Sequence, residues 1–288
     1  MSFKSILVPL SAPGLVKTSL QAAFRVAASF HAHIEALHTR QDQRMIAVSL
    51  MNESMSASMI DQIIKDNMKA AVSNTHKTRA AVEQACKAAG VRAAEKPSRG
   101  NKVTVAWREE IGYEDHSVVR RGRVSDLIVL SRPTTDIDIA MGLSLEAALM
   151  ESGRPILLVP PKVPSRIGGN IAIAWDGSAQ AARAVGQAMP FLLNARKVTI
   201  LTAAEESKED ANPAGLQSLL AWHGIKAKIE KVRTRGDVGK ALLGAAVRAN
   251  ANLLVMGAYS HSRLRELVLG GVTRHVLSDA EIPVFMVH

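Results

Sequence analysis

Short apolar runs recur along the chain, separated by longer stretches whose apolar residues have helical spacing. The runs are continuous rather than alternating, which is typical of strands buried on both faces of a parallel sheet. The runs expected to form strands are 4–10, 33–37, 103–107, 126–130 and 155–159 in one half, and 170–176, 198–201, 228–232, 252–256 and 283–287 in the other. Strands that alternate with helices predict an α/β chain of two tandem, doubly wound, Rossmann-like domains with five parallel strands each and helices on both faces.

The two halves differ in length. Ile6 and Ile171 occupy matching positions near the start of each half, and Ile128 matches Leu254 later on, so the first half carries roughly 40 extra residues within 40–100. This stretch is rich in methionine and includes Met45, Met51, Met55, Met59 and Met68. We expect an extra helical hairpin packed on the domain, with an adaptable surface for a partner or ligand as the alternative.

A segment rich in proline and glycine separates the halves, which predicts a linker at 161–169. The expected domains are therefore 1–160, with the helical insertion, and 170–288. Aromatic residues make up only 3% of the chain, so aliphatic side chains are expected to fill the core. The single cysteine, Cys86, lies in a helical stretch and is expected to be buried.

Neither a signal-peptide pattern nor an apolar run of about 20 residues is found, so the sequence predicts a cytoplasmic protein without a membrane partner. The formal charge of +10 would allow nucleic acid as a partner. However, the densest basic groups, at 120–123 and 263–265, are short and are not interleaved with stacking aromatic residues. A nucleic-acid partner is therefore not expected.

The most informative stretch follows the fourth strand of the second half. Gly257 ends that strand, where a missing side chain lets the backbone approach a ligand closely. Gly270 and Gly271 open a helix whose free N–H groups and dipole favour an anion, and Thr273 adds a hydroxyl one turn later. Nucleotides bind at such a loop on the carboxyl edge of a parallel sheet, although the same pattern also suits a plain turn.

This stretch resembles the ATP-binding loop of the universal stress protein family, which reads Gly, two residues, Gly, nine residues, Gly and then Ser or Thr. Gly257 and Gly270 match that pattern, whereas Ser260 replaces the second glycine and Gly271 replaces the Ser/Thr. The strand that ends in Asp176 is similar to the family's opening strand, whose terminal aspartate lies beside the adenosine part of the nucleotide. The resemblance covers the chain as a tandem pair and is stronger for 168–288 than for 1–160.

What the resemblance implies is a stress-response regulatory protein that binds ATP or ADP, with or without Mg²⁺, in its second half. The implied nucleotide-binding residues are Asp176, Gly257, Ser260, Gly270, Gly271, Val272 and Thr273. The family's sheet edges commonly mediate dimers, so we also expect a homodimer, with the tandem chain as a built-in pseudo-dimer, and a protein partner that the sequence does not identify.

Two alternatives remain open. The first is a module that binds a non-nucleotide ligand or a partner. The second is a slow ATP hydrolase, which would need a metal-bound phosphate and a positioned base or water. Asp176 is the one obvious acid and its implied place is the adenosine end, so no catalytic residue is assigned and at most weak ATPase activity is expected.

The first half departs from the family pattern. Ser11 stands where the second half has Asp176, and the loop after the fourth strand begins Ser131-Arg132-Pro133, without a glycine at the strand end. We expect this half to be degenerate, either structural or adapted to another ligand. His31 and His33 share a strand face, but no cysteine or carboxylate cluster has ligand spacing, so no metal site is expected.

Overall fold

The computed structural model describes residues 2–42, 56–95, 102–132, 139–203, 211–234, 236–259 and 271–288. The strands are β1 (Ser5–Pro9), β2 (His33–Arg40), β3 (Arg92–Ala93), β4 (Thr104–Ile111), β5 (Leu127–Ser131), β6 (Ile156–Val159), β7 (Asn170–Ala174), β8 (Lys197–Ala203), β9 (Ala227–Val232), β10 (Leu253–Gly257) and β11 (Val284–Val287). The helices are α1 (Pro13–Phe30), α3 (Ala57–Ala89), α4 (Glu114–Gly122), α5 (Ile139–Glu151), α6 (Ala179–Leu193), α7 (Pro213–Trp222), α8 (Val238–Arg248) and α9 (Gly271–Asp279).

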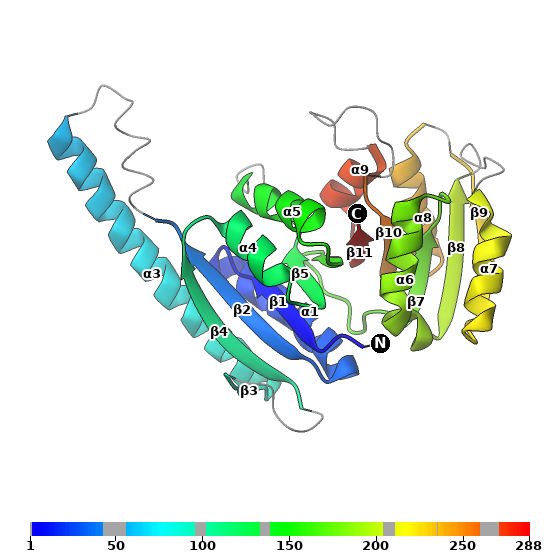
Figure 1. The fold of residues 1–288 in the computed structure, drawn as a ribbon, viewed down its shortest axis with the longest axis horizontal. Helices are drawn as coiled ribbons and strands as arrows, with labels where there is room; N and C mark the ends of the chain where they lie inside the picture. Colours follow the sequence, from blue (N-terminus) through cyan, green and yellow to red (C-terminus); the bar gives the residue numbers. More distant parts are fainter. Residues whose placement is uncertain are drawn as a thin grey trace.

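All these strands belong to one sheet with the order β3-β4-β2-β1-β5-β6-β11-β10-β7-β8-β9 (Figure 1). The order β4-β2-β1-β5-β6 in the first half corresponds to β9-β8-β7-β10-β11 in the second, and every pair within a half is parallel. The halves meet where β6 pairs antiparallel with β11, with Leu157 opposite Phe285. The predicted tandem α/β fold is thus confirmed, and the chain has the form of a built-in pseudo-dimer.

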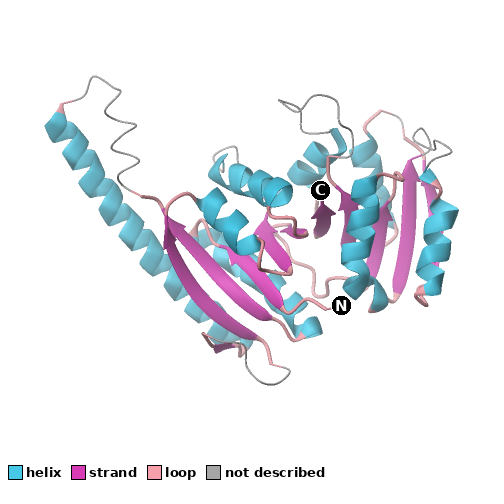
Figure 2. Ribbon diagram, viewed as in Figure 1, coloured by secondary structure: helices cyan, strands magenta, loops and turns pink. Residues whose placement is uncertain are grey.

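Helices cover both faces of the sheet (Figure 2). On one face, α1, α3, α6 and α7 bury apolar side chains against the strands, and on the other face α4, α5, α8 and α9 do so. Each of the two cores runs through both halves without a break. The apolar runs of the sequence are continuous because every central strand packs against helices on both sides.

The junction between the halves holds an aromatic cluster. Phe30 and Phe191 meet at a ring-centroid distance of 5.2 Å, and Phe3 lies 5.2 Å from each of them. Phe285 completes the group at 6.0 Å from Phe191 and is fully buried. The expectation of an aliphatic core therefore needs correction here, since four of the five phenylalanines gather at this one place.

The structure describes only part of the insertion in the first half, because 43–55 and 96–101 lie outside the described residues, so the expected hairpin stays a prediction. A single 33-residue helix, α3, occupies the second crossover, where the second half has the 10-residue α7. Ser56 caps its N-terminus, and this N-terminal end of the helix extends beyond the sheet (Figure 1). Met59 and Met68 are 55% and 46% exposed, so they do not pack against the domain, whereas Met45, Met51 and Met55 lie outside the described residues.

Two smaller expectations concern single features. Cys86 is buried on the inner face of α3, as predicted, and burial raises the pKa of its thiol. None of the helices that the structure describes has the length and apolar character needed to cross a membrane. The segment at 160–169 connects β6 to β7, and its Ile167 packs into the core rather than standing free in solvent.

Candidate functional site

The predicted site lies at the carboxyl edge of the second half, between β7 and β10. These neighbouring parallel strands pair Ala174 with Met256, so Asp176 and Ala258 follow at the same level. From β7 the chain crosses to β8 on one side, and β10 lies on the other side, so the strand order reverses between them. Ligands of doubly wound folds bind at such a reversal point. The topology therefore brings Asp176 and Gly257 to the place where that rule expects a ligand.

Asp176 shapes the turn that leads into α6. Its Oδ1 accepts a hydrogen bond of 2.9 Å from the backbone N–H of Ser178. Ser178 in turn caps α6, because its Oγ accepts a hydrogen bond of 3.1 Å from the N–H of Ala181. Gly177, at φ 78°, adopts a left-handed conformation that suits a residue without a side chain. The carboxylate is thus held at the carboxyl edge of the sheet, next to the start of α6, and it is partly exposed.

Gly257 is explained by helix packing. A Cβ atom at this position would lie 2.5 Å from the backbone nitrogen of Ala181 and 2.7 Å from the carbonyl carbon of Gln180. The end of β10 therefore presses against the first turn of α6. The predicted close approach of backbone at Gly257 is present, but the structure shows it to be an approach to a helix.

Tyr259 and Thr273 close the start of the loop. The backbone N–H of Tyr259 donates to Thr273 Oγ1 at 3.4 Å, and Thr273 is only 4% exposed. The hydroxyl of Thr273 thus holds the loop against α9. Tyr259 has φ 58°, a left-handed conformation that costs a non-glycine residue about 1–2 kcal/mol. Burial, and then the negative charge of Glu146, raise the pKa of Tyr259 to about 12.

Helix α9 begins at Gly271 and packs on α8. The backbone of Val272 lies over Gly239, where a Cβ atom would come within 3.2 Å of the Val272 Cα. His275 Nδ1 lies 3.2 Å from Asp237 Oδ2, and Asp237 caps α8 through the N–H of Lys240. That hydrogen bond is the main reason why the pKa of Asp237 is lowered. Of the remaining predicted residues, Ser260 and Gly270 lie outside the described residues.

Comparison with known proteins places these features in a family. Residues 169–288 match the model of the universal stress protein family. The universal stress protein Slr1230 of Synechocystis sp. is 26% identical over 166 residues, which cover 55% of this chain and 56% of that protein, so the chain spans about half the length of this curated relative. Residues 169–288 are a universal stress protein domain.

Solved structures extend the likeness to the whole chain. The crystal structure of a universal stress protein from Archaeoglobus fulgidus DSM 4304 matches with a TM-score of 0.70 at 17% identity and covers 98% of this chain and 97% of that one. A protein of unknown function from Pseudomonas aeruginosa PAO1 matches with a TM-score of 0.54 at 16% identity, covering 99% and 92% of the two chains. The fold of both halves is therefore that of a tandem universal stress protein, as the sequence predicted.

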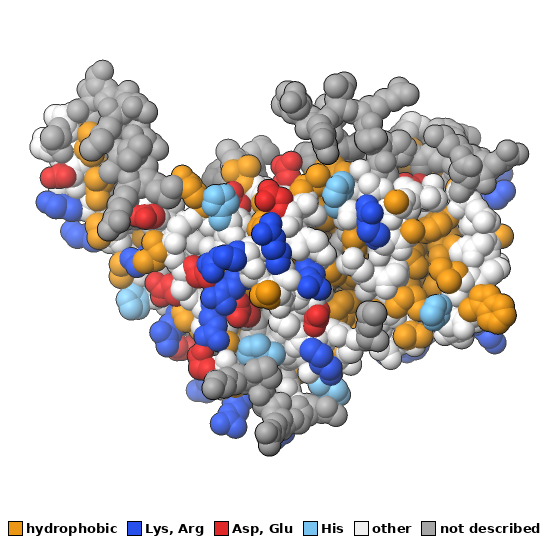
Figure 3. Space-filling view, in the orientation of Figure 1, with side chains coloured by type: hydrophobic (Ala, Val, Ile, Leu, Met, Phe, Trp, Pro, Cys, Tyr) orange, Lys and Arg blue, Asp and Glu red, His pale blue; other side chains and the backbone are white. Residues whose placement is uncertain are grey.

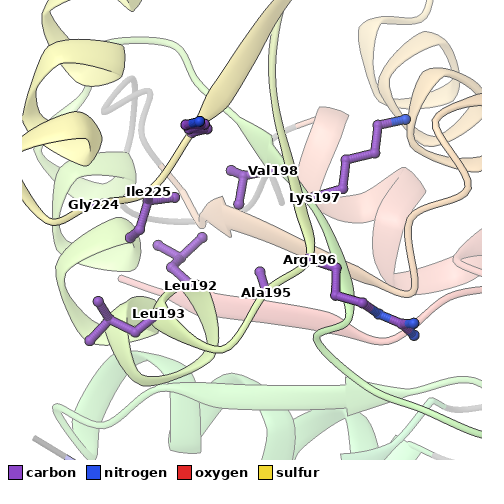
Figure 4. Close-up of a pocket in the computed structure, with 9 residues that line it drawn as sticks. Leu192, Leu193, Ala195, Arg196, Lys197, Val198, Gly224 and Ile225 are labelled. Carbon is purple, nitrogen blue, oxygen red and sulfur yellow. The ribbon is translucent and has the colours of Figure 1, made fainter.

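A depression lies at the amino end of the universal stress protein domain, opposite the predicted site (Figure 4). It has a volume of about 220 Å³ and lies between the end of α6 and the starts of β8 and β9. In Figure 4 the side chains of Arg196 and Lys197 point away from Leu192 and Ile225, so the cations do not converge on it. We assign no ligand to this depression.

Charged side chains gather over the first half, whereas apolar ones are prominent over the universal stress protein domain (Figure 3). Arg120 and Arg121, which the sequence singles out as a basic group, lie 2.6 and 2.7 Å from the carboxylate oxygens of Glu110, and Arg121 also lies 3.1 Å from Glu35. These arginines are therefore engaged by acids of β2 and β4 and do not form a free cationic patch. The other basic group, at 263–265, lies outside the described residues.

The histidines near β2 have structural partners. His33 Nδ1 lies 2.8 Å from Thr104 Oγ1, and burial lowers the pKa of His33. His38 is buried with its Nδ1 2.9 Å from the carbonyl oxygen of Leu10, and His31 ends α1 in a left-handed conformation. In the part of the chain that is described, no group of three His, Cys, Asp or Glu residues could hold a metal ion.

Sequence reasoning assigned no role to three residues of this edge: Tyr259, Asp237 and His275. Asp237 carried a usable signal, because a Gly-Asp pair before an apolar helical stretch is a common helix start. Tyr259 and His275 carried no such signal in the sequence. Their contacts join β10 to α9 and α8 to α9, which come together only in the folded protein.

Proposed function

We propose that the universal stress protein domain binds an ATP-type nucleotide, ATP or ADP with or without Mg²⁺, at the carboxyl edge of β7 and β10. The observation that supports this best is the position of Asp176, which follows β7 at the point where the strand order reverses. A carboxylate there can accept hydrogen bonds from ribose hydroxyls. One of its oxygens already accepts from Ser178, which holds the side chain in place before a ligand arrives.

In this proposal the phosphates lie at the other end of the edge. The N-terminus of α9 begins at Gly271, and free N–H groups of a helix start stabilise an anion. Ser260 and Gly270 would complete the loop by the family pattern. Val272 and Thr273 would act by supporting it, since the Thr273 hydroxyl holds Tyr259 and Val272 lies over Gly239. Bound Mg²⁺ would neutralise phosphate charge.

Nucleotide occupancy would make the chain a regulatory protein of the stress response rather than an enzyme. Ordering of the loop after β10 would change the surface that a second copy of the chain or a protein partner contacts. The proposal includes a homodimer and a cytoplasmic location, which the single buried thiol of Cys86 suits, because a reduced cysteine is normal there.

The test is nucleotide release from freshly purified protein. We expect about one equivalent of ATP or ADP per chain after denaturation, and we expect Asp176→Asn to lose it. Asparagine keeps an oxygen that can accept from Ser178 and so preserves the turn, whereas the acceptor for both ribose hydroxyls is weakened. Ser11→Asn, at the matching position of the first half, is the control and should leave the nucleotide content unchanged.

Two results would contradict the proposal. One is the absence of released nucleotide together with no binding of added ATP and Mg²⁺. The other is equal nucleotide content in wild type and Asp176→Asn. Appearance of ADP from added ATP at a steady rate would instead favour the weak hydrolase.

A further inference from the structure

A cavity of about 700 Å³ lies at the carboxyl edge of the first half, on the side of β1 that faces β2 and β4, whereas the edge proposed for the nucleotide in the second half lies between the counterparts of β1 and β5. Its walls come from the residues that follow β1, β2 and β4 and from helices α3 and α5. The lining residues that carry the argument are Ser11, Thr39, Asn67, Asn74, Glu114 and Ser144. Sites for small molecules commonly measure about 300–1,000 Å³, so the cavity has a suitable size.

A carboxyl group is present at this edge although Ser11 replaces the aspartate. The Ser11 hydroxyl donates a hydrogen bond of 2.6 Å to Glu114 Oε1. Glu114 opens α4, so the carboxyl group comes from the loop after β4 instead of the loop after β1. Burial raises the pKa of Glu114, and the bond from Ser11 opposes that rise. The replacement of the aspartate by Ser11 therefore does not leave this edge without a carboxyl group.

One hydroxyl group in the cavity wall, Thr39 Oγ1, is buried and has no hydrogen-bond partner among the described residues. A second, on Ser144, is 1% exposed and faces the Glu114 carboxyl, whose pKa it lowers. Nearly all buried polar groups in proteins are hydrogen-bonded, so an unmatched hydroxyl that lines a cavity indicates a polar ligand or water.

Helix α3 supplies the amide wall of the cavity. Asn67 and Asn74 are seven positions apart, which puts them on one face of the helix two turns from each other, and both are partly buried. Ala70 and Ala71 lie between them and leave room because their side chains are small. An amide both donates and accepts hydrogen bonds. At the matching crossover of the second half, the described helix is the shorter α7, with 10 residues.

The charges around the cavity do not favour a phosphate. Among the described residues of the lining, Arg40 is the one arginine or lysine, and its Nε lies 3.7 Å from Glu109 Oε1 without a hydrogen bond. His38 also lines the cavity, but its ring nitrogens lie 2.9 Å from the Leu10 carbonyl and 3.1 Å from Thr75 Oγ1. The lining further includes two acids, Glu114 and Asp115. The described part of the lining therefore has no surplus positive charge to neutralise an anion.

We propose that the first half binds a small uncharged ring compound with neighbouring hydroxyl groups, a sugar or a nucleoside, in this cavity. Neighbouring hydroxyls each donate and accept, and the wall offers them a carboxyl group, two amides and the unmatched hydroxyl of Thr39. The site is independent of the nucleotide edge in the second half, because none of its lining residues lies beyond Ser144.

The chain carries its own fluorescent reporter for this cavity. Trp107 stacks on His38 with ring centroids 5.7 Å apart and an interplanar angle of 22°, and His38 lines the cavity. The other two tryptophans, Trp175 and Trp222, lie in the second half and can be replaced by phenylalanine. Asp176→Asn in the same full-length chain keeps a nucleotide edge in the second half from taking up the probe.

The experiment titrates this single-tryptophan protein with adenosine and, separately, with trehalose. We expect a saturable change in Trp107 fluorescence with at least one of them: adenosine alone identifies a nucleoside, trehalose alone a free sugar, and both a general polyol site. The response should be at least tenfold weaker in affinity for Asn74→Leu and unchanged for the matched control Ser73→Leu, an exposed neighbour outside the lining. Raising the salt concentration should leave it unchanged, because no ion pair is formed.

Three outcomes would overturn the proposal. They are no saturable change with either compound, an equal response in Asn74→Leu and Glu114→Gln as in the parent protein, and equal affinity for 2′,3′-dideoxyadenosine when adenosine is the compound that binds. Glu114→Gln keeps the size of the side chain, so it remains informative if leucine at position 74 disturbs α3. Asp176 is already altered in this protein, so failure here is separate from failure of the nucleotide proposal.

Discussion

The two halves share a strand order but fill matching positions at their carboxyl edges differently. In the second half, Asp176 follows the first strand, and Gly257 lets β10 press against α6. In the first half the matching residues are Ser11, bonded to Glu114 at 2.6 Å, and Ser131, bonded to Ser19 of α1 at 2.6 Å. The fold can thus bring a carboxyl group to the same edge from two different loops, so loss of the residue at one position does not mean loss of the chemistry.

The largest effect is expected from a substitution at the junction, which tests whether the two halves are stable independently of each other. Phe285 lies on β11 at the junction and is fully buried beside Phe3 and Phe191. Phe285→Ala should lower the free energy of unfolding by about 3–5 kcal/mol, because a large buried ring is lost and a cavity is left. Denaturant unfolding followed by circular dichroism measures this change.

The junction also predicts that both halves unfold together. Single-tryptophan proteins that keep either Trp107 or Trp175 should give coincident unfolding curves, because both cores cross the junction without a break. Leu219→Ala is the control for the stability loss of Phe285→Ala. It removes a side chain that is 50% exposed and should change the free energy of unfolding by no more than about 0.5 kcal/mol. Separate transitions for the two tryptophans would show two independent halves joined only by sequence.

The next largest change in stability is expected at the ends of β10 and β5, where Gly257 and Ser131 occupy matching positions. Gly257→Ala places a methyl group 2.5 Å from the backbone nitrogen of Ala181, so either α6 or β10 must move. We expect a loss of about 1–3 kcal/mol, the usual cost of overpacking. Ser131→Ala creates the same residue at the matching position and should cost about 1 kcal/mol through its lost hydrogen bond to Ser19. Equal melting temperatures for the two variants would contradict this explanation of the glycine.

The strands of both halves were predictable from the sequence, because a strand that is buried on both sheet faces is a continuous apolar run. The junction between the halves was not predictable. The pairing of β6 with β11 joins segments that are more than 120 residues apart, and the four clustered phenylalanines are spread from Phe3 to Phe285. No local pattern distinguishes such residues from those of any other core.

The site was predictable in part for a similar reason. Asp176 and Gly257 stand at strand ends, which can be read from the sequence, and topology then brings them to one edge. Glu114 was missed because only the order β4-β2-β1 carries the loop after β4 toward Ser11. The expectation that the methionines of the insertion pack on the domain was wrong for Met59 and Met68 of α3, which are exposed, because apolar spacing indicates a helix but does not say whether each of its faces is covered.

A smaller effect is expected from giving the first half the acid of the second. Ser11→Asp places a second carboxyl group against Glu114, where the serine hydroxyl now donates at 2.6 Å. Two carboxylates that share a site repel each other, so we expect a loss of about 1 kcal/mol near pH 7 that largely disappears when the pH is low enough to protonate them. Ser11→Asn has the same shape without the charge and is the control. Unfolding curves at two pH values would contradict the idea if aspartate and asparagine behaved alike at both.

The smallest effect concerns the pH dependence of stability at Glu114. Burial raises the pKa of this carboxyl group, with Ser11, Ser144 and His38 opposing the rise and Asp115 adding to it. Folding therefore favours the protonated form, and the stability gained from it is complete below the pKa of the unfolded chain and is lost as the pH rises through the pKa of the folded chain. Glu114→Gln cannot titrate. The stability of wild type relative to this variant should accordingly fall as the pH is raised from 4 to 7, measured by denaturant unfolding at each pH. A relative stability that rises over this range would mean that the folded protein prefers the carboxylate, and the hydrogen bond from Ser11 would then outweigh the burial of Glu114.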